Sequence, residues 1–379
     1  MKGRIAVLTT GRQDWGILRS TCVLLRASPA FDLRVLAGGM ACSRRHGRTE
    51  TLLHEDGFAP AESLPWVGDE GAAGALQQAG AAVVAVGEAL SRQLPEALVL
   101  VGDRFETAAA ALAATLCRVP LVHLHGGEET LGSMDNAFRH AITKLSHLHL
   151  VSHQQHRDRV IAMGEARESV HVVGAPGLDN ARREDLADRA ELEALFGLDL
   201  KPPVVLVTLH PVTLGGDPES EAQAVCAAMD AVEARYVITL PNTDPGHEGV
   251  RRRLHAATAR PGRVAVEALG ERRYWGLLRL CDALLGNSSS ALIEAPLLRL
   301  PAVNVGLRQQ GRMLAANVIE APAAAAEIGA ALTRALSARF RSSLADMDSP
   351  FGDGGAAERI LSVLSDWTVP KPPAKRSVA

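Results

Sequence analysis

Acidic side chains follow predicted strands in the first half of the chain. Asp103 comes directly after the apolar run Ala97–Val101, and Glu128 and Asp135 follow the next run. Because the carboxyl ends of parallel strands meet at one edge of a sheet, we expect these carboxylates to lie close together. Neighbouring acids in a closed site have their pKa values pushed apart, which supplies a base and an acid. A local interpretation is the alternative, in which Asp103 pairs with Arg104 and Asp135 caps a helix.

A turn in the second half has the composition of a phosphate-binding site. It is Gly286–Ser290, with the sequence Gly-Asn-Ser-Ser-Ser, and a predicted helix begins near Ala291. Backbone N–H groups and three hydroxyls would stand at the helix N-terminus, where the helix dipole favours an anion. His210 and Arg308 follow neighbouring strands, which favours a diphosphate over the alternative of a serine that only caps the helix. The chain has no GxxxxGK and no GxGxxG after its first strand, which argues against a P-loop nucleotidase and bound NAD.

Histidines are dense between residues 123 and 156. A metal site through His123 and His125 is conceivable, but no CxxC or HExxH motif accompanies them, so structural roles are favoured. Trp15 could stack on a sugar or pack at a domain edge. The sequence leaves these two roles open.

Short β-branched runs alternate with Ala- and Leu-rich helical segments along the whole chain, which indicates parallel sheets covered by helices on both faces. The regularity breaks between Gly174 and Pro203, the predicted domain boundary. We therefore predict two doubly wound Rossmann-like halves whose strand ends face each other across a cleft. The predicted strands are residues 4–10, 32–37, 97–101, 121–124, 148–151, 170–173, 204–209, 236–240, 264–268, 283–285 and 302–305.

Composition narrows the class of protein. The 379 residues suggest two or three domains at ~150 residues each, and the net charge of −3 implies no general attraction to nucleic acid or membranes. Aromatic residues make up 3%, which disfavours stacking platforms for single-stranded nucleic acid. No apolar run has membrane-spanning length, and the run after the N-terminus is too short for a signal peptide. Five scattered cysteines without a CxxC are typical of buried thiols in a reducing cytoplasm.

Several motifs together resemble the UDP-N-acetylglucosamine 2-epimerase family, in order from about residue 4 to residue 317. The Arg139–Lys144 segment resembles the hydrolysing branch, which serves sialic-acid-type sugar synthesis, more than the non-hydrolysing branch. The matching segments are Gly102–Glu106, His125–Glu128, Arg139–Lys144, Leu209–Val212, Pro241–Asp244, Gly286–Ser290 and Asn304–Gln309.

The resemblance implies a GT-B architecture and a reaction. The predicted domains are residues 1–175, with the acid/base groups, and 176–352, with the UDP site; a helix in 353–367 returns to the first domain. The Pro- and Lys-rich residues 368–379 are predicted to be disordered. The implied reaction is UDP-GlcNAc + water → ManNAc + UDP, through a 2-acetamidoglycal and without a metal or redox cofactor. Family members often form dimers or tetramers, so we expect a homo-oligomer.

The resemblance also assigns roles to residues. The implied catalytic residues are Asp103, His125, Glu128, Asp135 and Arg139. The implied UDP-sugar-binding residues are Arg12, Arg104, His140, His210, Asn242, Asp244, Ser288, Ser289, Ser290, Glu294 and Arg308.

One position departs from the family pattern. Many members carry a glutamate in an HxEGG arrangement where this chain has His125. Either His125 acts as acid/base, which the pKa range of histidine allows, or Glu128 takes the role. A UDP-2,4-diacetamido-trideoxy hexose is therefore a second candidate substrate. We also consider a non-hydrolysing epimerase that gives UDP-ManNAc, a GT-B glycosyltransferase, and a nucleotide-sugar-binding protein without catalysis.

Overall fold

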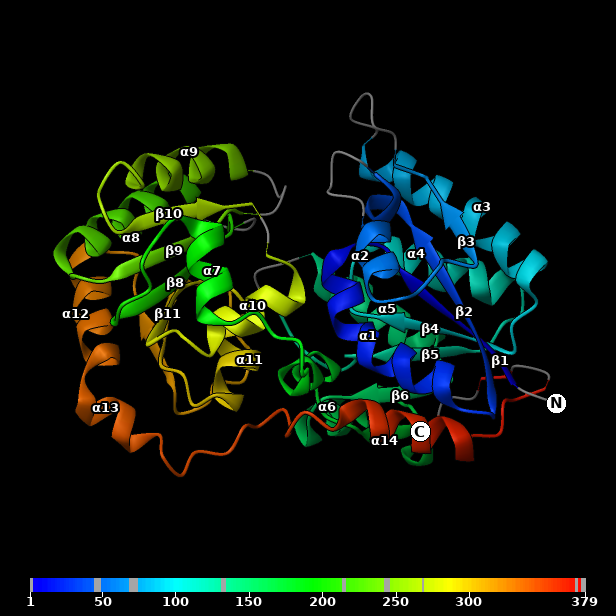
Figure 1. Cartoon of the computed structure of the whole chain (residues 1–379). Coiled ribbons are helices and arrows are strands. Elements are labelled where there is room, and N and C mark those ends of the chain that lie inside the picture. The colour runs from blue at the N-terminus through cyan, green and yellow to red at the C-terminus, as the bar shows by residue number, and fades with distance from the viewer. Residues whose placement is uncertain are drawn as a thin grey trace. The chain divides into compact units, whose positions relative to one another are not determined.

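The computed structural model describes residues 3–43, 49–67, 74–130, 134–212, 216–241, 246–267, 269–371 and 374–375 (Figure 1). The side chains of Arg12 and Thr49 lie outside this description. The chain forms two compact units. The first comprises Met1–Glu128, Met134–Asp179 and Phe351–Ala379, and the second comprises Glu129–Ser133 and Asn180–Pro350.

The first unit is built on a parallel sheet with the strand order β3-β2-β1-β4-β5-β6-β7. The order reverses between β1 and β4, and such a switch point is where open α/β sheets bind ligands. Its strands are β1 (Gly3–Thr9), β2 (Phe31–Gly38), β3 (Glu62–Leu64), β4 (Ala97–Val101), β5 (Leu121–Leu124), β6 (Leu148–Val151) and β7 (Val170–Val172). Its helices are α1 (Arg12–Ala27), α2 (Thr49–Glu55), α3 (Ala75–Gln93), α4 (Phe105–Leu116), α5 (Asp135–Leu145), α6 (Gln154–Ala162) and α14 (Ala356–Asp366).

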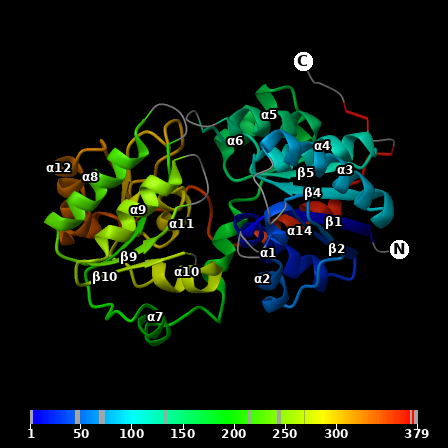
Figure 2. The ribbon, with the colours of Figure 1, turned by 90° about the horizontal axis from the view of Figure 1, so that it is seen from above.

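Both faces of this sheet are buried, because successive side chains of a strand point to opposite faces. In β1, Ile5 and Val7 belong to one apolar cluster, and Ala6 and Leu8 belong to another. Figure 2 shows α1, α2 and α14 on one side of the sheet and α3, α4 and α5 on the other. The chain must therefore supply continuous apolar strands, which is the pattern that the sequence displays.

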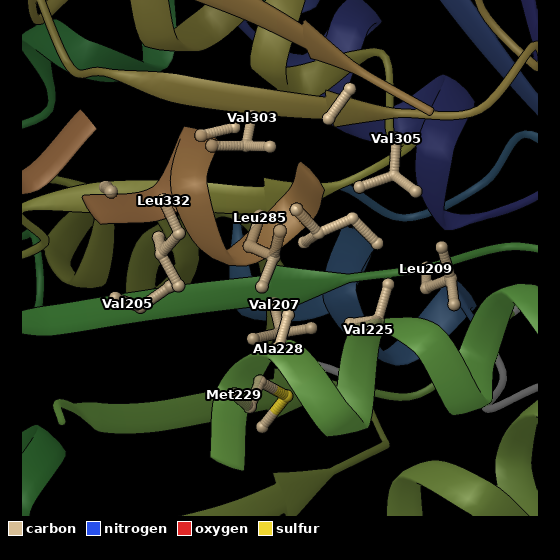
Figure 3. Packing of buried hydrophobic residues seen from close by; sticks show 14 of the residues in the cluster. Val205, Val207, Leu209, Val225, Ala228, Met229, Leu285, Val303, Val305 and Leu332 are labelled. Atoms are coloured by element: carbon tan, nitrogen blue, oxygen red, sulfur yellow. The ribbon is translucent and has the colours of Figure 1, made fainter. Parts of the chain in front are cut away.

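The second unit repeats this plan with the parallel order β10-β9-β8-β11-β12-β13 and a switch point between β8 and β11. Figure 3 shows its core, where Val207 of the central strand packs near Val225 and Met229 of α8. Its strands are β8 (Val204–Thr208), β9 (Arg235–Thr239), β10 (Arg263–Val266), β11 (Ala283–Gly286), β12 (Ala302–Val305) and β13 (Val318–Ala321). Its helices are α7 (Arg189–Phe196), α8 (Pro218–Ala231), α9 (His247–Ala257), α10 (Gly270–Leu278), α11 (Ser290–Leu297), α12 (Ala325–Leu336) and α13 (Ala338–Ser343).

The structure confirms every predicted strand, with ends that differ by at most two residues. It adds β3 and β13, which are edge strands of the two sheets. β3 has only three residues and no β-branched one, so the strand pattern does not reveal it. Within the described residues, no helix is long and apolar enough to cross a membrane. None of the five cysteines, all within the described residues, forms a disulfide: Cys22 is buried and the others are partly buried.

The chain returns to the first unit after residue 350. Ile360 and Leu364 of α14 join the same apolar cluster as Ile5 and Val7. Beyond the helix, Lys375 donates to the carbonyl oxygens of Thr143 and Ser146 at the end of α5. Lys375 belongs to residues 368–379, for which disorder stays a prediction; residues 372–373 and 376–379 lie outside the described residues.

Candidate active site

A buried arginine joins two of the predicted acid positions in the first unit. Arg139 of α5 is 1% exposed. Its Nη2 donates to Oδ2 of Asp103 after β4, and its Nη1 donates to the carbonyl oxygen of Glu128 at 2.9 Å. The arginine therefore fixes α5 against the ends of β4 and β5. The local interpretation of Asp103 is wrong, because Arg104 pairs with Glu106 at 3.2 Å instead.

His125 and Glu128 form a hydrogen-bonded pair at the end of β5. Nδ1 of His125 lies 2.7 Å from Oε1 of Glu128. The His125 backbone has a φ of +63°, a left-handed conformation that is uncommon for a residue other than glycine and that occurs often at functional sites. Nε2 of His125 is buried and has no hydrogen-bond partner among the described residues. The two candidates for the missing family glutamate, His125 and Glu128, are thus hydrogen-bonded to each other. Nδ1 of His125 makes this bond, and Nε2 makes none with a described residue.

Two further residues complete this pair, and no sequence motif indicates either of them. Oγ of Ser152, after β6, lies 3.1 Å from Oε1 of Glu128. Nδ1 of His156, on α6, lies 2.9 Å from the same Oγ. Burial lowers the pKa of His156 to about 4, so its ring is neutral at physiological pH. A hydrogen-bonded chain of four side chains therefore extends from the partly buried His125 to the buried Glu128, Ser152 and His156.

His123 has a different role from His125. Its Nε2 lies 2.9 Å from the carbonyl oxygen of Gly102, and its Nδ1 lies 3.3 Å from Oγ1 of Thr143. Burial lowers its pKa to about 3, which keeps the ring neutral. Both ring nitrogens serve the packing of β5. In the part of the chain that the structure describes, no group of three or more His, Cys, Asp or Glu side chains is placed to hold a metal ion.

The other predicted residues of the first unit lie along the same strand ends. Asp135 is the first residue of α5, and Met134 is the N-cap. A carboxylate in the first turn interacts favourably with the helix dipole. His140 follows Arg139 on α5 and is half-buried. Arg12 begins α1, but its side chain lies outside the described residues.

Asp14, in the first turn of α1, is a further buried carboxylate that is not among the predicted site residues. Its Oδ2 accepts hydrogen bonds from the backbone N and Oγ1 of Thr10, at 2.8 and 2.6 Å. Burial raises its pKa to about 6, although these hydrogen bonds favour the charged form. The carboxylate ties α1 to the end of β1. Trp15 beside it packs inside the unit, where its Nε1 donates to Asp56 at 2.9 Å, so it is not a sugar platform.

In the second unit, Asn287 joins the ends of β8, β11 and β12. Its Oδ1 accepts from the backbone N of His210 at 2.8 Å, and its Nδ2 donates to the His210 carbonyl at 2.9 Å. Its own carbonyl oxygen accepts from Nη1 of Arg308 at 3.2 Å and from Nε2 of Gln309 at 2.7 Å. Two predicted phosphate-binding residues, His210 and Arg308, are therefore held by one buried asparagine.

A tyrosine hydroxyl holds the end of the serine turn Gly286–Ser290 by a hydrogen bond. Tyr274 of α10 donates its hydroxyl hydrogen to Oγ of Ser290 at 2.5 Å. Ser290 is the first residue of α11, and the N-cap Ser289 makes no side-chain capping bond. Oγ of Ser288 accepts from the backbone N of Ser290 at 3.3 Å, so a serine does cap the start of α11, and phosphate binding by this turn stays a prediction. Glu294 lies one turn further along α11 and is half-buried; Asn242 and Asp244 lie outside the described residues.

Gly286 permits the backbone path of this turn. Its φ is +139°, and a Cβ atom there would lie 2.0 Å from the carbonyl oxygen of Thr208. Only glycine lets β11 approach β8 so closely before the turn begins.

Comparison with known proteins decides the family. The sequence profile described as UDP-N-acetylglucosamine 2-epimerase matches residues 24–365. The chain belongs to the UDP-N-acetylglucosamine 2-epimerase family. It is 32% identical over 369 residues to a UDP-N,N'-diacetylbacillosamine 2-epimerase (hydrolyzing) from Legionella pneumophila, covering 97% of this chain and 96% of that protein. It is 29% identical over 370 residues to a polysialic acid biosynthesis protein from Escherichia coli, covering 96% and 94%.

The fold of this epimerase is that of the solved family structures. The UDP-GlcNAc 2-epimerase from Neisseria meningitidis, solved with UDP-GlcNAc, matches with a TM-score of 0.82 at 16% identity, over 96% of this chain and all of that one. The two parallel-sheet units are thus the two domains of a GT-B fold, as the motifs predict.

Proposed function

We propose that this epimerase hydrolyses a UDP-2-acetamido sugar with inversion at C2, with UDP-GlcNAc + water → ManNAc + UDP as its reaction. The observation that supports this most strongly is the set of proton-handling groups at the ends of β4 and β5, where Arg139 contacts Asp103 and His125 contacts Glu128. UDP departs from C1 by anti-elimination, which gives a 2-acetamidoglycal. Water then adds to the glycal, and a proton returns to the opposite face of C2.

We assign proton transfer to the first unit. The residues concerned are Asp103, His125, Glu128, Asp135 and Arg139. Inversion at C2 requires one group that removes a proton and a different group that returns one, because each acts on its own face of the ring. A site with a histidine and several carboxylates supplies both kinds of group. A retaining glycosyltransferase would not need this set around C2.

The second unit would bind UDP. No carbonyl acidifies the C2 proton, so departure of the diphosphate must drive its removal, and preorganised donors on the leaving group carry much of the catalysis. The proposed contacts to UDP and the sugar from this unit are His210, Asn242, Asp244, Ser288, Ser289, Ser290, Glu294 and Arg308. The first unit would add Arg12, Arg104 and His140. The hydrogen bonds from Asn287 to His210 support this role, since they hold the backbone of a proposed ligand in place before substrate binds.

A second substrate fits the same chemistry. The Legionella relative acts, by its name, on UDP-N,N'-diacetylbacillosamine. That sugar carries an acetamido group at C4 and no hydroxyl at C6, while C1 and C2 are the same as in UDP-GlcNAc. The proposed chemistry would therefore be unchanged, and only contacts to C4 and C6 would differ.

Nuclear magnetic resonance in deuterated water tests the proposal. The purified protein is incubated with UDP-GlcNAc and, separately, with UDP-N,N'-diacetylbacillosamine. We expect free UDP and a 2-epimerised free sugar that carries deuterium at C2. An Asp103→Asn variant should lose the exchange.

Three different results would change the assignment. UDP-ManNAc at equilibrium would indicate a non-hydrolysing epimerase. Transfer of the sugar to an added acceptor by an active Asp103→Asn variant would indicate a glycosyltransferase. Tight UDP binding without turnover of either sugar would indicate a binding protein.

We also propose that the chain works as a homo-oligomer in the cytoplasm. The outer face of α3 and α4 carries no charged residue in 75–87 or 107–117, and Leu76, Val84 and Leu116 are 84%, 61% and 69% exposed on it. Surface helices normally carry charges there. At one end of this face Glu88 and Arg92 lie one turn apart, so a two-fold related copy could pair them reciprocally. Free thiols are typical of a reducing compartment.

A further inference from the structure

We infer that Nε2 of His125 is the atom that removes the C2 proton, and that Glu128, Ser152 and His156 are positioning residues that place the ring proton on Nδ1 and so aim the lone pair of Nε2. The inference rests on the proposed function and deepens it. It chooses between the two candidates for the missing family glutamate and adds two residues that no motif indicates.

The directions of the hydrogen bonds follow from the chemistry of each group. A carboxylate only accepts, so Oε1 of Glu128 accepts from Nδ1 of His125 at 2.7 Å and from Oγ of Ser152 at 3.1 Å. Ser152 has one hydroxyl hydrogen, and it points to Glu128, so Ser152 has no hydrogen to donate to His156. The contact of 2.9 Å between Ser152 and His156 must therefore run the other way, with Nδ1–H of His156 as donor.

This chain of donors fixes the tautomer of His125. A neutral imidazole carries one proton, and the bond to Glu128 places it on Nδ1. Nε2 is left with a free lone pair. That atom is buried and has no partner among the described residues, a state that costs free energy unless a ligand group completes it.

The backbone at His125 is a second, independent observation. Its φ of +63° is strained for a residue with a Cβ atom. The following loop fits closely: a Cβ atom on Gly127 would lie 2.4 Å from the carbonyl oxygen of His156. Arg159 of α6 also donates to the Gly127 carbonyl. The strained residue is therefore held against the helix that carries the last member of the chain.

Atoms and electrons balance in this step. The lone pair of Nε2 takes the C2 proton, the C2–H electron pair forms the C1=C2 bond, and the C1–O electron pair leaves with UDP. The imidazolium that results is stabilised by the Glu128 carboxylate, as in a histidine–carboxylate pair of a hydrolase. A group on the opposite face supplies the proton that inverts C2, and His125 returns its own proton to solvent.

Nitrogen NMR of histidine-labelled protein tests the hydrogen-bond chain without any substrate. We expect His125 with a bare Nε2 and a protonated Nδ1, and His156 with a protonated Nδ1. In Glu128→Ala, which removes the acceptor of Nδ1–H, His125 should become a mixture of tautomers. A protonated Nε2 on His125 in the resting wild type would overturn the inference.

Kinetics test the catalytic role. We expect Glu128→Gln to lower kcat about a hundredfold or more, and Ser152→Ala to lower it about tenfold with KM unchanged. Ser146→Ala is the matched control, because Ser146 is equally buried in the same unit and its hydroxyl only donates to Ile142. Thermal melts check that each variant folds. Unchanged kcat in both Glu128→Gln and Ser152→Ala would refute the positioning role.

An experiment with added 2-acetamidoglycal tests this inference separately from the proposed function. A His125→Asn variant should fail to release UDP from the substrate, yet it should still hydrate added 2-acetamidoglycal in the presence of UDP, because that step uses the other group. If the variant releases UDP as fast as the wild type, the inference fails and the proposed function stands. If the wild type turns over no UDP-sugar at all, the proposed function fails and the catalytic assignment fails with it.

Discussion

Arg139 is the residue on which the geometry of the first site depends most. One guanidinium contacts Asp103, the Glu128 carbonyl and Asn136, and it does so from the interior of the protein. The planar guanidinium carries several N–H donors in a fixed arrangement, so it can bond to three acceptors at once. The ammonium of lysine is a point charge on a flexible stem and does not fix such an arrangement.

Removing this guanidinium should damage both stability and activity. We expect Arg139→Met to lower the free energy of unfolding by about 3 kcal/mol, because it leaves Asp103 and a buried carbonyl without their donor, and to lower kcat by ~10²-fold or more through misplacement of the site. Urea denaturation and steady-state kinetics measure these effects. Arg252→Met, which breaks an exposed pair with Glu219 in the second unit, is the control and should leave both unchanged.

Asp14 predicts a pH dependence of stability. Its pKa is raised by burial from 3.8 to about 6, so the folded state prefers the protonated form. The folded state therefore loses stability as the pH rises from 4 to 6 and through the folded pKa, by about 3 kcal/mol when complete. An asparagine can accept the same Thr10 bonds without a charge. We expect Asp14→Asn to be more stable than wild type at pH 8 and to match it near pH 4 in urea denaturation; an equal difference at both pH values would contradict the shift.

At the scale of elements, sequence predicts what depends on local pattern. β-branched runs bounded by turns predicted all but two strands, and the serine turn predicted the N-terminus of α11. Contacts between distant elements were not predictable in this way. Asp103 pairs with a residue 36 positions away and not with its neighbour, because side chains of consecutive residues at a helix start point in different directions.

The same limit explains the residues that were missed. Ser152, His156, Tyr274 and Asn287 are common residue types at unremarkable positions in the sequence. Their roles come from the packing of β6, α6 and α10 against the strand ends, and no spacing along the chain encodes that packing. His125 was a candidate only because it departs from the family pattern.

The turn after β11 should not tolerate a side chain at its first residue. We expect Gly286→Ala to weaken UDP binding at least tenfold and to lower the free energy of unfolding by about 2 kcal/mol or more, because the methyl group meets the Thr208 carbonyl. Calorimetric titration with UDP and urea denaturation measure the two effects. The control is Gly329→Ala in α12, where a Cβ atom would meet nothing within 4 Å. That variant should gain up to about 1 kcal/mol through helix propensity, and wild-type UDP affinity in Gly286→Ala would show that the turn adapts.

At the scale of the whole molecule, the alternation of strands and helices predicted two doubly wound halves, and the motifs predicted the GT-B fold. The strand orders of the two sheets are equivalent apart from the extra edge strand β7, and each sheet has polar residues after the strands at its switch point. The predicted boundary after residue 175 lies four residues before the change of unit at Asp179. The oligomeric state depends on which side chains are exposed on the surface rather than on the fold. The motifs alone therefore do not predict it.

The uncharged face of α3 and α4 makes that state testable. We expect the wild type to sediment as a dimer or larger, and a Val84→Glu, Leu116→Glu double variant to sediment as a folded monomer, because four buried carboxylates would face each other across a two-fold axis. Leu195→Glu, which charges an exposed leucine of the second unit, should leave the oligomer intact. A monomeric wild type would remove the support for this surface.

The return of α14 to the first unit has a consequence for synthesis on the ribosome. Ile360 and Leu364 complete the core that β1 and α1 begin, so the unit whose first strand emerges earliest from the exit tunnel is the last to have all its parts. The second unit, by contrast, consists of the unbroken stretch Asn180–Pro350 and the short earlier segment Glu129–Ser133, so all of it precedes residue 351. A nascent chain halted after residue 350 would therefore hold a finished second unit and an unfinished first unit with an open apolar patch over α1. The order of folding would then run opposite to the order of translation.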